Sequence, residues 1–82
     1  MPNYRVLLFA TLRDLAGQAE VTLNLPAEAS IADVRAALAE AYPALTPYLD
    51  TAIFAVNHAF TTEETTLNPT DEIAAFPPVS GG

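Results

Sequence analysis

The fold is decided by the stretch Ser30-Ile31-Ala32-Asp33-Val34-Arg35-Ala36-Ala37-Leu38-Ala39-Glu40-Ala41. It predicts one amphipathic helix, because apolar residues recur on a single stripe at helical spacing: Ile31, Val34, Leu38 and Ala41. Ser30 and Asp33 stand three residues apart at its start, as in a capping box that satisfies the first free N–H groups. Pro43 disfavours helix at the residue before it, so we expect the helix to end near Tyr42.

Segments typical of strands precede this helix. Residues 4–10 form a β-branched, aromatic and leucine-rich run that predicts a strand buried on both faces. Residues 12–17 predict a short helical turn closed by glycine. Residues 20–25 alternate polar and apolar, which predicts a second strand with every second residue from Val21 onward facing the core.

The segments after the helix predict, in order, a helical turn and three strands: residues 45–50, 52–56, 59–61 and 72–76. Asn57-His58 and Asn68-Pro69-Thr70-Asp71 separate strands as turns by composition. The order β-β-α-β-β-β predicts an α+β fold, in which a mixed sheet wraps over one main helix. First and last strands are similarly apolar, so we expect them to pair in parallel at the sheet centre. The chain then divides into a domain, residues 1–76, and an extended tail, residues 77–82.

Composition narrows the possible partners. The chain has 82 residues, no cysteine, and ten acidic residues against three basic ones, for a formal net charge of −7. The lack of thiols excludes disulfides and cysteine-ligated metals. The acidic balance disfavours nucleic acid and anionic membrane surfaces and favours a basic protein surface. No signal-peptide pattern and no membrane-spanning apolar run is evident, which predicts a cytoplasmic protein.

A conventional active site is not predicted. We expect His58, the only histidine, to be a polar turn residue, since no nucleophile or orienting acid is evident beside it. Glu63-Glu64 and Asp71-Glu72 are adjacent acids that point apart, which favours solvated surface over a catalytic pair. Without a histidine pair or a glycine-rich phosphate cradle, we expect no metal and no tightly bound cofactor.

Residues 76–82, Phe-Pro-Pro-Val-Ser-Gly-Gly, form the chemically distinctive segment. Pro77 and Pro78 favour an extended conformation that holds the following residues away from the domain. Gly81 and Gly82 lack a Cβ, so this backbone is slim enough for a narrow channel, and the α-carboxylate of Gly82 is unhindered. The pattern predicts a flexible end that enters the active site of another protein.

The last strand and tail, residues 71–82, resemble the small subunits of molybdopterin synthase, which are ubiquitin-like β-grasp sulfur carriers. The match extends to residues 6–17 and to Ala55-Val56-Asn57, and length and element order agree. A terminal glycine pair is common to all ubiquitin-like proteins. The full segment Phe-Pro-Pro-Val-Ser-Gly-Gly is more specific.

The resemblance implies a non-catalytic, sulfur-donating subunit of a transferase complex. An E1-like adenylyltransferase would join Gly82 to AMP, consuming ATP, and sulfur from a sulfurtransferase would convert the acyl group to a thiocarboxylate. The thiocarboxylate would donate its sulfur to cyclic pyranopterin monophosphate on the large synthase subunit, building the molybdopterin dithiolene. The implied assembly is a heterotetramer of two small and two large subunits.

The resemblance also implies which residues contact these partners: Phe9, Arg13, Phe60, Phe76, Pro77, Pro78, Val79 and Ser80, besides Gly81 and Gly82. Strand alternation puts Phe76 opposite Ile73. If Ile73 fills the core, Phe76 lies on the outer face, where an aromatic ring suits a binding hot spot. If both faces of the sheet are covered, Phe76 is a core residue instead.

Three other functions fit the same pattern. A sulfur carrier for thiamin, cysteine or tungsten-cofactor synthesis would use the same terminus with another acceptor. A ubiquitin-like modifier would be conjugated to lysines of target proteins. A β-grasp interaction module with an inert tail would tolerate truncation.

Overall fold

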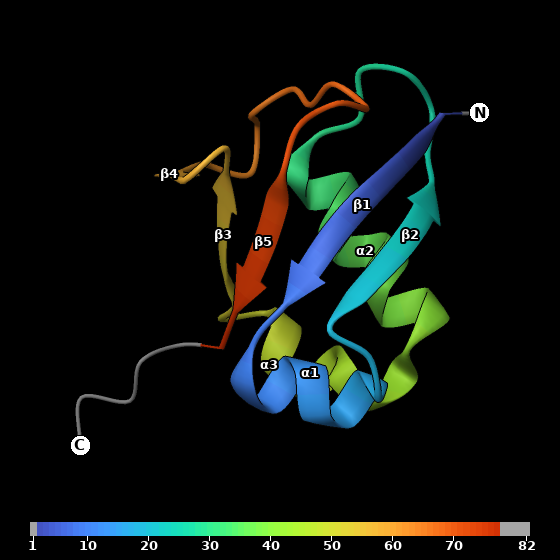
Figure 1. The fold of residues 1–82 in the computed structure, drawn as a ribbon, viewed down its shortest axis with the longest axis vertical. Helices are drawn as coiled ribbons and strands as arrows, with labels where there is room; N and C mark the ends of the chain where they lie inside the picture. Colours follow the sequence, from blue (N-terminus) through green and yellow to red (C-terminus); the bar gives the residue numbers. More distant parts are fainter. Residues whose placement is uncertain (1, 78–82) are drawn as a thin grey trace.

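A computed structural model describes residues 2–77, and Figure 1 shows their arrangement. Residues 78–82, which include Gly81 and Gly82, lie outside the described residues. The elements follow in the order β1 (Asn3–Leu8), α1 (Ala10–Ala16), β2 (Glu20–Asn24), α2 (Ile31–Ala41), the 3₁₀ turn η1 (Pro43–Leu45), α3 (Thr46–Leu49), β3 (Ile53–Val56), β4 (Ala59–Phe60) and β5 (Ile73–Phe76). The predicted α+β class is confirmed.

The strands form one mixed sheet in the order β2-β1-β5-β3-β4. β1 pairs with β2 antiparallel and with β5 parallel, and Val6 is the register partner of Ile73. β3 pairs antiparallel with both β5 and β4. The predicted parallel pairing of first and last strands at the sheet centre is therefore confirmed, and it sends β5 out of the sheet at the end where β1 turns into α1 (Figure 1).

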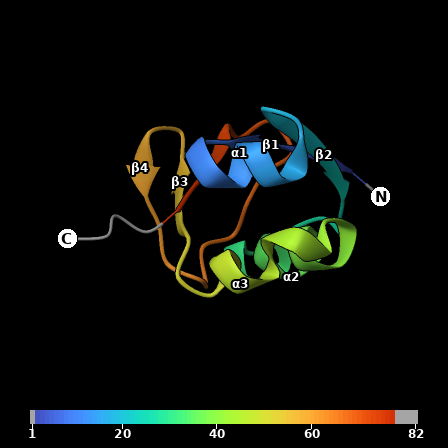
Figure 2. The ribbon, with the colours of Figure 1, turned by 90° about the horizontal axis from the view of Figure 1, so that it is seen from below.

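Helix α2 covers one face of this sheet, and Figure 2 shows the helix and the sheet as two separate layers. Its predicted capping box is present: Ser30 Oγ accepts from the N–H of Asp33 at 3.3 Å, and Asp33 Oδ2 accepts from the N–H of Ser30 at 2.9 Å. Three residues of the predicted stripe are buried in the core: Ile31, Val34 and Leu38. The fourth assignment is wrong, because Ala41 is exposed and lines a surface groove beside β2.

The prediction for the first strand is also wrong in part. β1 ends at Leu8, and Ala10 already belongs to α1. Its burial alternates: Tyr4, Val6 and Leu8 lie in the core, whereas Arg5 is exposed on the other face. The strand is not buried on both faces because α2 packs against one of them only (Figure 2).

The predicted turns are confirmed. Gly17 ends α1 in the left-handed region at φ 76°, a conformation that favours glycine. Asn57 and His58 both have positive φ, 51° and 70°, as in the two-residue turns that join tight hairpins, here β3 to β4. The N–H of Asp71 donates to the carbonyl of Asn68 at 2.9 Å, closing the turn before β5.

Arg35, which lies off the apolar stripe, links α2 to the segment before β3 and to the loop after β4. Its guanidinium donates to the carbonyls of Leu49 and Ala52 and forms an ion pair with Glu63. The same group lies 4.9 Å from the ring centroid of Phe54. These contacts hold the start of β3 against the helix. Within residues 2–77, no helix has the length and apolar character needed to cross a bilayer.

Candidate partner-binding site

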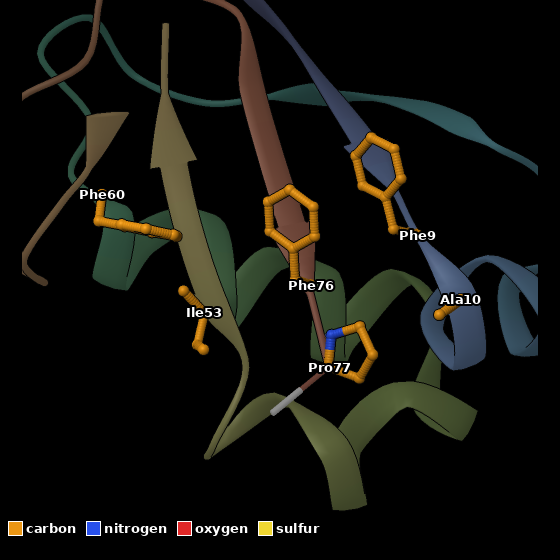
Figure 3. Close-up of a pocket in the computed structure, with 6 residues that line it drawn as sticks. All are labelled: Phe9, Ala10, Ile53, Phe60, Phe76 and Pro77. Carbon is orange, nitrogen blue, oxygen red and sulfur yellow. The ribbon is translucent and has the colours of Figure 1, made fainter. Parts of the chain in front are cut away.

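An apolar hollow lies on the face of the sheet that α2 does not cover. Its volume is about 330 Å³, and its lining residues are Phe9, Ala10, Ile53, Phe60, Phe76 and Pro77. In Figure 3, Ile53, Phe60 and Phe76 lie on β3, β4 and β5, and Pro77 lies where the chain leaves β5. Phe9 and Ala10 lie where β1 turns into α1. The hollow therefore lies where the chain leaves the sheet, at Pro77.

Strand alternation decides the position of Phe76. Ile73 and Ala75 are both 0 % exposed and belong to the core, so Ala74 and Phe76 point to the opposite face. Phe76 is half-buried there and is the register partner of Ile53 on β3. Of the two positions open from the sequence, the structure therefore has Phe76 on the outer face.

Phe9 supplies the second aromatic wall. Its ring stacks on that of Phe76, with centroids 4.7 Å apart and planes 9° from parallel. The N–H of Phe9 donates to the carbonyl of Ala75 at 3.3 Å, which ties this residue to β5. Ala10 follows with φ 51°, an uncommon value for a residue with a Cβ, and this sharp change of direction turns β1 into α1 beside the hollow.

Phe60 is the most exposed of the large apolar side chains in the described part of the chain, at 80 %. It stands on β4, a two-residue edge strand that the Asn57-His58 turn presents to solvent. A solvent-exposed phenylalanine side chain beside an apolar hollow is typical of a protein-docking surface. The hollow and this ring together form what we call the aromatic face, defined by Phe9, Ala10, Ile53, Phe60, Phe76 and Pro77.

The structure brings together four of the residues predicted to contact partners: Phe9, Phe60, Phe76 and Pro77. Arg13 does not line the hollow; it lies on α1 with its side chain 53 % exposed and Nε 3.8 Å from Asp14. Pro78, Val79, Ser80, Gly81 and Gly82 lie outside the described residues.

Ala10 and Ile53 also line the hollow, but the sequence did not predict them as partner-contacting residues. Alternation over residues 52–56 places Ile53 opposite the buried Phe54, but only the β3–β5 register sets it beside Phe76.

The expectation that no acid stands beside His58 is wrong. Its Nε2 lies 3.3 Å from Glu72 Oε2, because the β3–β4 turn packs against the start of β5 and the N–H of Asn57 donates to the carbonyl of Glu72 at 2.8 Å. Both side chains are largely exposed, 84 % and 48 %, so this is a surface contact. Asp71 also contacts the β3–β4 turn, because its carboxylate accepts from the side chain of Asn57 at 3.0 Å.

Comparison with known proteins gives a family and relatives that agree with the resemblance found in the sequence. The ThiS family matches residues 6–82. The molybdopterin synthase sulfur carrier subunit of Chlamydomonas reinhardtii is 38 % identical over 80 residues, which cover 95 % of this chain and 96 % of the relative. The subunit of the same name from Arabidopsis thaliana is 33 % identical over 78 residues, covering 95 % of this chain and 81 % of the relative.

Among solved structures, small archaeal modifier protein 1 of H. volcanii superposes with a TM-score of 0.86 at 28 % identity, covering 96 % of this chain and all of that one (100 %). The fold is thus the ubiquitin-like β-grasp expected from the sequence. The chain belongs to the ThiS family, and its predicted resemblance to molybdopterin synthase sulfur carrier subunits is confirmed.

Proposed function

We propose that this chain is the sulfur carrier subunit of a molybdopterin synthase and acts in the cytoplasm. In this proposal the carboxylate of Gly82 attacks the α-phosphate of ATP on an E1-like enzyme, releasing pyrophosphate and forming an acyl-adenylate. A persulfide of a sulfurtransferase then displaces AMP to give an acyl disulfide, and a thiol reduces this disulfide, which releases the C-terminal thiocarboxylate. The large synthase subunit takes up the tail, and the sulfur passes to cyclic pyranopterin monophosphate.

The aromatic face carries this proposal, because it explains how a small domain delivers its terminus. Phe76 directly precedes Pro77, the first residue of the proposed tail, and its ring stacks on the ring of Phe9. A partner that buries this hollow and the exposed ring of Phe60 fixes the origin of the tail relative to its own active site. Buried aromatic anchors of this kind dominate the affinity of protein interfaces.

Charge supports the same type of partner. The chain carries a formal net charge of −7, and complementary fields accelerate encounter with a basic protein surface. The adenylating enzyme and the large subunit both need access to the tail. We therefore propose that they use the aromatic face in turn and not at the same time.

The decisive experiment is intact-mass analysis of the chain after incubation with the activating enzyme, ATP and a sulfur source. We expect the mass to rise by the difference between one sulfur and one oxygen. Addition of large subunit and cyclic pyranopterin monophosphate should then restore the original mass and yield molybdopterin. An unchanged mass with an active enzyme preparation would contradict the proposal.

A ubiquitin-like modifier is the second candidate, favoured by the fold match to small archaeal modifier protein 1. It would use the same activated Gly82 but transfer the acyl group to a lysine of a target protein. Mass spectrometry of isopeptide-linked peptides ending in Gly81-Gly82 separates the two functions, because a pure sulfur carrier leaves no such linkage.

A further inference from the structure

The sheet has a second accessible feature at its other edge. β2 is the terminal strand on that side and pairs only with β1 among the described residues. The opposite edge, β4, is two residues long, whereas β2 spans five residues, Glu20–Asn24. Short edge strands resist pairing with other chains, so β2 is the edge that can accept another strand.

The hydrogen-bond pattern shows which groups of β2 are open. The N–H of Leu8 donates to the carbonyl of Ala19, and the N–H of Leu25 donates to the carbonyl of Pro2. Because bonded pairs alternate along an antiparallel ladder, Val21 and Leu23 bond to β1, and the backbone groups of the residues between them point outward. In the described part of the chain, the outward N–H and C=O groups therefore belong to Glu20, Thr22 and Asn24.

A groove runs beside these open groups, between β2 and α2. Its volume is about 420 Å³, and it is lined by Thr22, Leu23, Asn24, Leu25, Ala37, Glu40 and Ala41. The helix presents only alanines and one glutamate here, which leaves room for the side chains of an added strand. The exposed Ala41, which the sequence pattern had assigned to the core, lies in this groove.

The groove is bounded at the end where β2 begins and α2 ends. There the side-chain amide of Gln18 donates to the Tyr42 hydroxyl at 2.9 Å. This bond links a residue shortly before β2 to the residue directly after α2. It therefore fixes the position of the start of β2 relative to the end of α2.

Charge indicates what can occupy the groove. Among residues 2–77, the only ionisable residue that lines the groove is Glu40. Glu20, which is exposed at the start of β2, lines a different hollow with Arg5 and Leu7 on the other face of the sheet. A second copy of this chain, with its own formal net charge of −7, would be repelled. The unpaired backbone groups match another extended backbone, and the carboxylate of Glu40 matches a basic side chain that this backbone places in the groove.

We propose that the β2 edge and the groove beside it, which we call the edge groove (Glu20–Asn24, Leu25, Ala37, Glu40 and Ala41), bind an extended basic peptide segment of a partner protein by strand addition. Within the part of the chain that the structure describes, the edge groove shares no residue with the aromatic face. The peptide and the large subunit therefore bind at the same time, and the peptide serves to recruit the carrier.

The test is an NMR titration of the ¹⁵N-labelled full chain with an acetylated, amidated peptide of alternating arginine and valine, long enough to span β2. We expect the amide shifts to concentrate at Glu20, Thr22 and Asn24 and in the last two turns of α2. The same peptide with glutamate in place of arginine should not bind. Shifts confined to the aromatic face, or equal binding of the acidic peptide, would overturn the proposal.

Backbone methylation tests strand addition itself. In an alternating peptide, all arginine N–H groups point to one edge and all valine N–H groups to the other. N-methylation of one set should abolish binding, because that set faces β2, and methylation of the other set should leave it largely intact. If neither set matters, the peptide is held by charge alone and strand addition is wrong.

Variants of the protein provide the matching control. Thr22→Pro removes an outward N–H without removing a bond to β1, so it should weaken peptide binding about tenfold relative to Thr22→Ala, which keeps that donor. Glu40→Arg, on the exposed surface of α2, tests the charge independently if Thr22→Pro lowers the folded fraction. Neither Thr22→Ala nor Glu40→Arg should change affinity for the large subunit, and full peptide affinity in Glu40→Arg would contradict the role of charge.

Discussion

The ring of Phe9 lies parallel to the ring of Phe76, with a centroid separation of 4.7 Å, and so joins the N-cap of α1 to the last residue of β5. The two residues are distant in sequence, yet both stand where an element ends. Stacked aromatic pairs of this kind contribute about 0.5–1.5 kcal/mol beyond the area they bury. The contact therefore stabilises the end of the sheet at which the chain leaves β5, and it shapes the aromatic face.

Phe76→Ala should weaken the complex with the large subunit by about 2 kcal/mol or more, because it removes the central ring of the aromatic face. Isothermal titration calorimetry measures this loss. Tyr48→Ala is the matched control: Tyr48 is a large exposed side chain on α3, 41 % exposed, and does not line the hollow. Equal losses in the two variants, or an unfolded Phe76→Ala domain, would show that the role assigned to Phe76 is wrong.

Phe60→Ala separates binding from stability. Since this side chain is 80 % exposed, its truncation should change the free energy of unfolding by no more than about 0.5 kcal/mol. Affinity for the large subunit should nevertheless fall by more than about 1 kcal/mol. Urea denaturation and calorimetry give the two values, and unchanged affinity would remove Phe60 from the proposed interface.

Gly82 should be indispensable for sulfur transfer, since the proposed chemistry takes place on its carboxylate. Deleting Gly82, or adding one residue after it, should abolish thiocarboxylate formation while the thermal unfolding midpoint stays unchanged. Mass spectrometry and differential scanning calorimetry provide the two readouts. Wild-type molybdopterin yield from the deleted chain would refute the assignment.

Gly81→Val tests the width of the channel that receives the tail. A branched side chain at this position restricts φ and ψ and adds bulk where only backbone is expected to fit. Activity should fall sharply in single-turnover assays, with little change in stability. If stability falls by as much as activity, Gly81 supports the fold and the channel argument fails.

Arg35→Gln should destabilise the domain, because Arg35 bonds two backbone carbonyls and Glu63 with its side chain only 20 % exposed. Because a charged group loses its hydrogen bonds, the free energy of unfolding measured by urea denaturation should fall by about 2–3 kcal/mol. Arg13→Gln is the control, because its ion pair with Asp14 is solvent-exposed and should contribute less than about 0.5 kcal/mol. Equal effects would show that the Arg35 contacts add no stability.

The helix, the strand sequence and the proposed reacting end were predictable because each depends on neighbours along the chain. Ser30 and Asp33 form their capping box within one turn of α2, and Gly17 ends α1 through its own backbone freedom. The apolar alternation from Val21 onward identifies a strand and its inward residues without any tertiary information. The segment around Gly82 is recognised from its own composition.

The outer faces of β1 and β5 were decided by tertiary structure. Alternation shows that Arg5 and Val6 point to opposite sides, and likewise Ala75 and Phe76, but not which side α2 will cover. The neighbours on the aromatic face depend on the register of strands that are far apart in sequence, as do the contact of His58 with Glu72 and the exposure of Ala41 beside β2. Such contacts arise from packing between elements, and local periodicity carries no information about which element lies opposite.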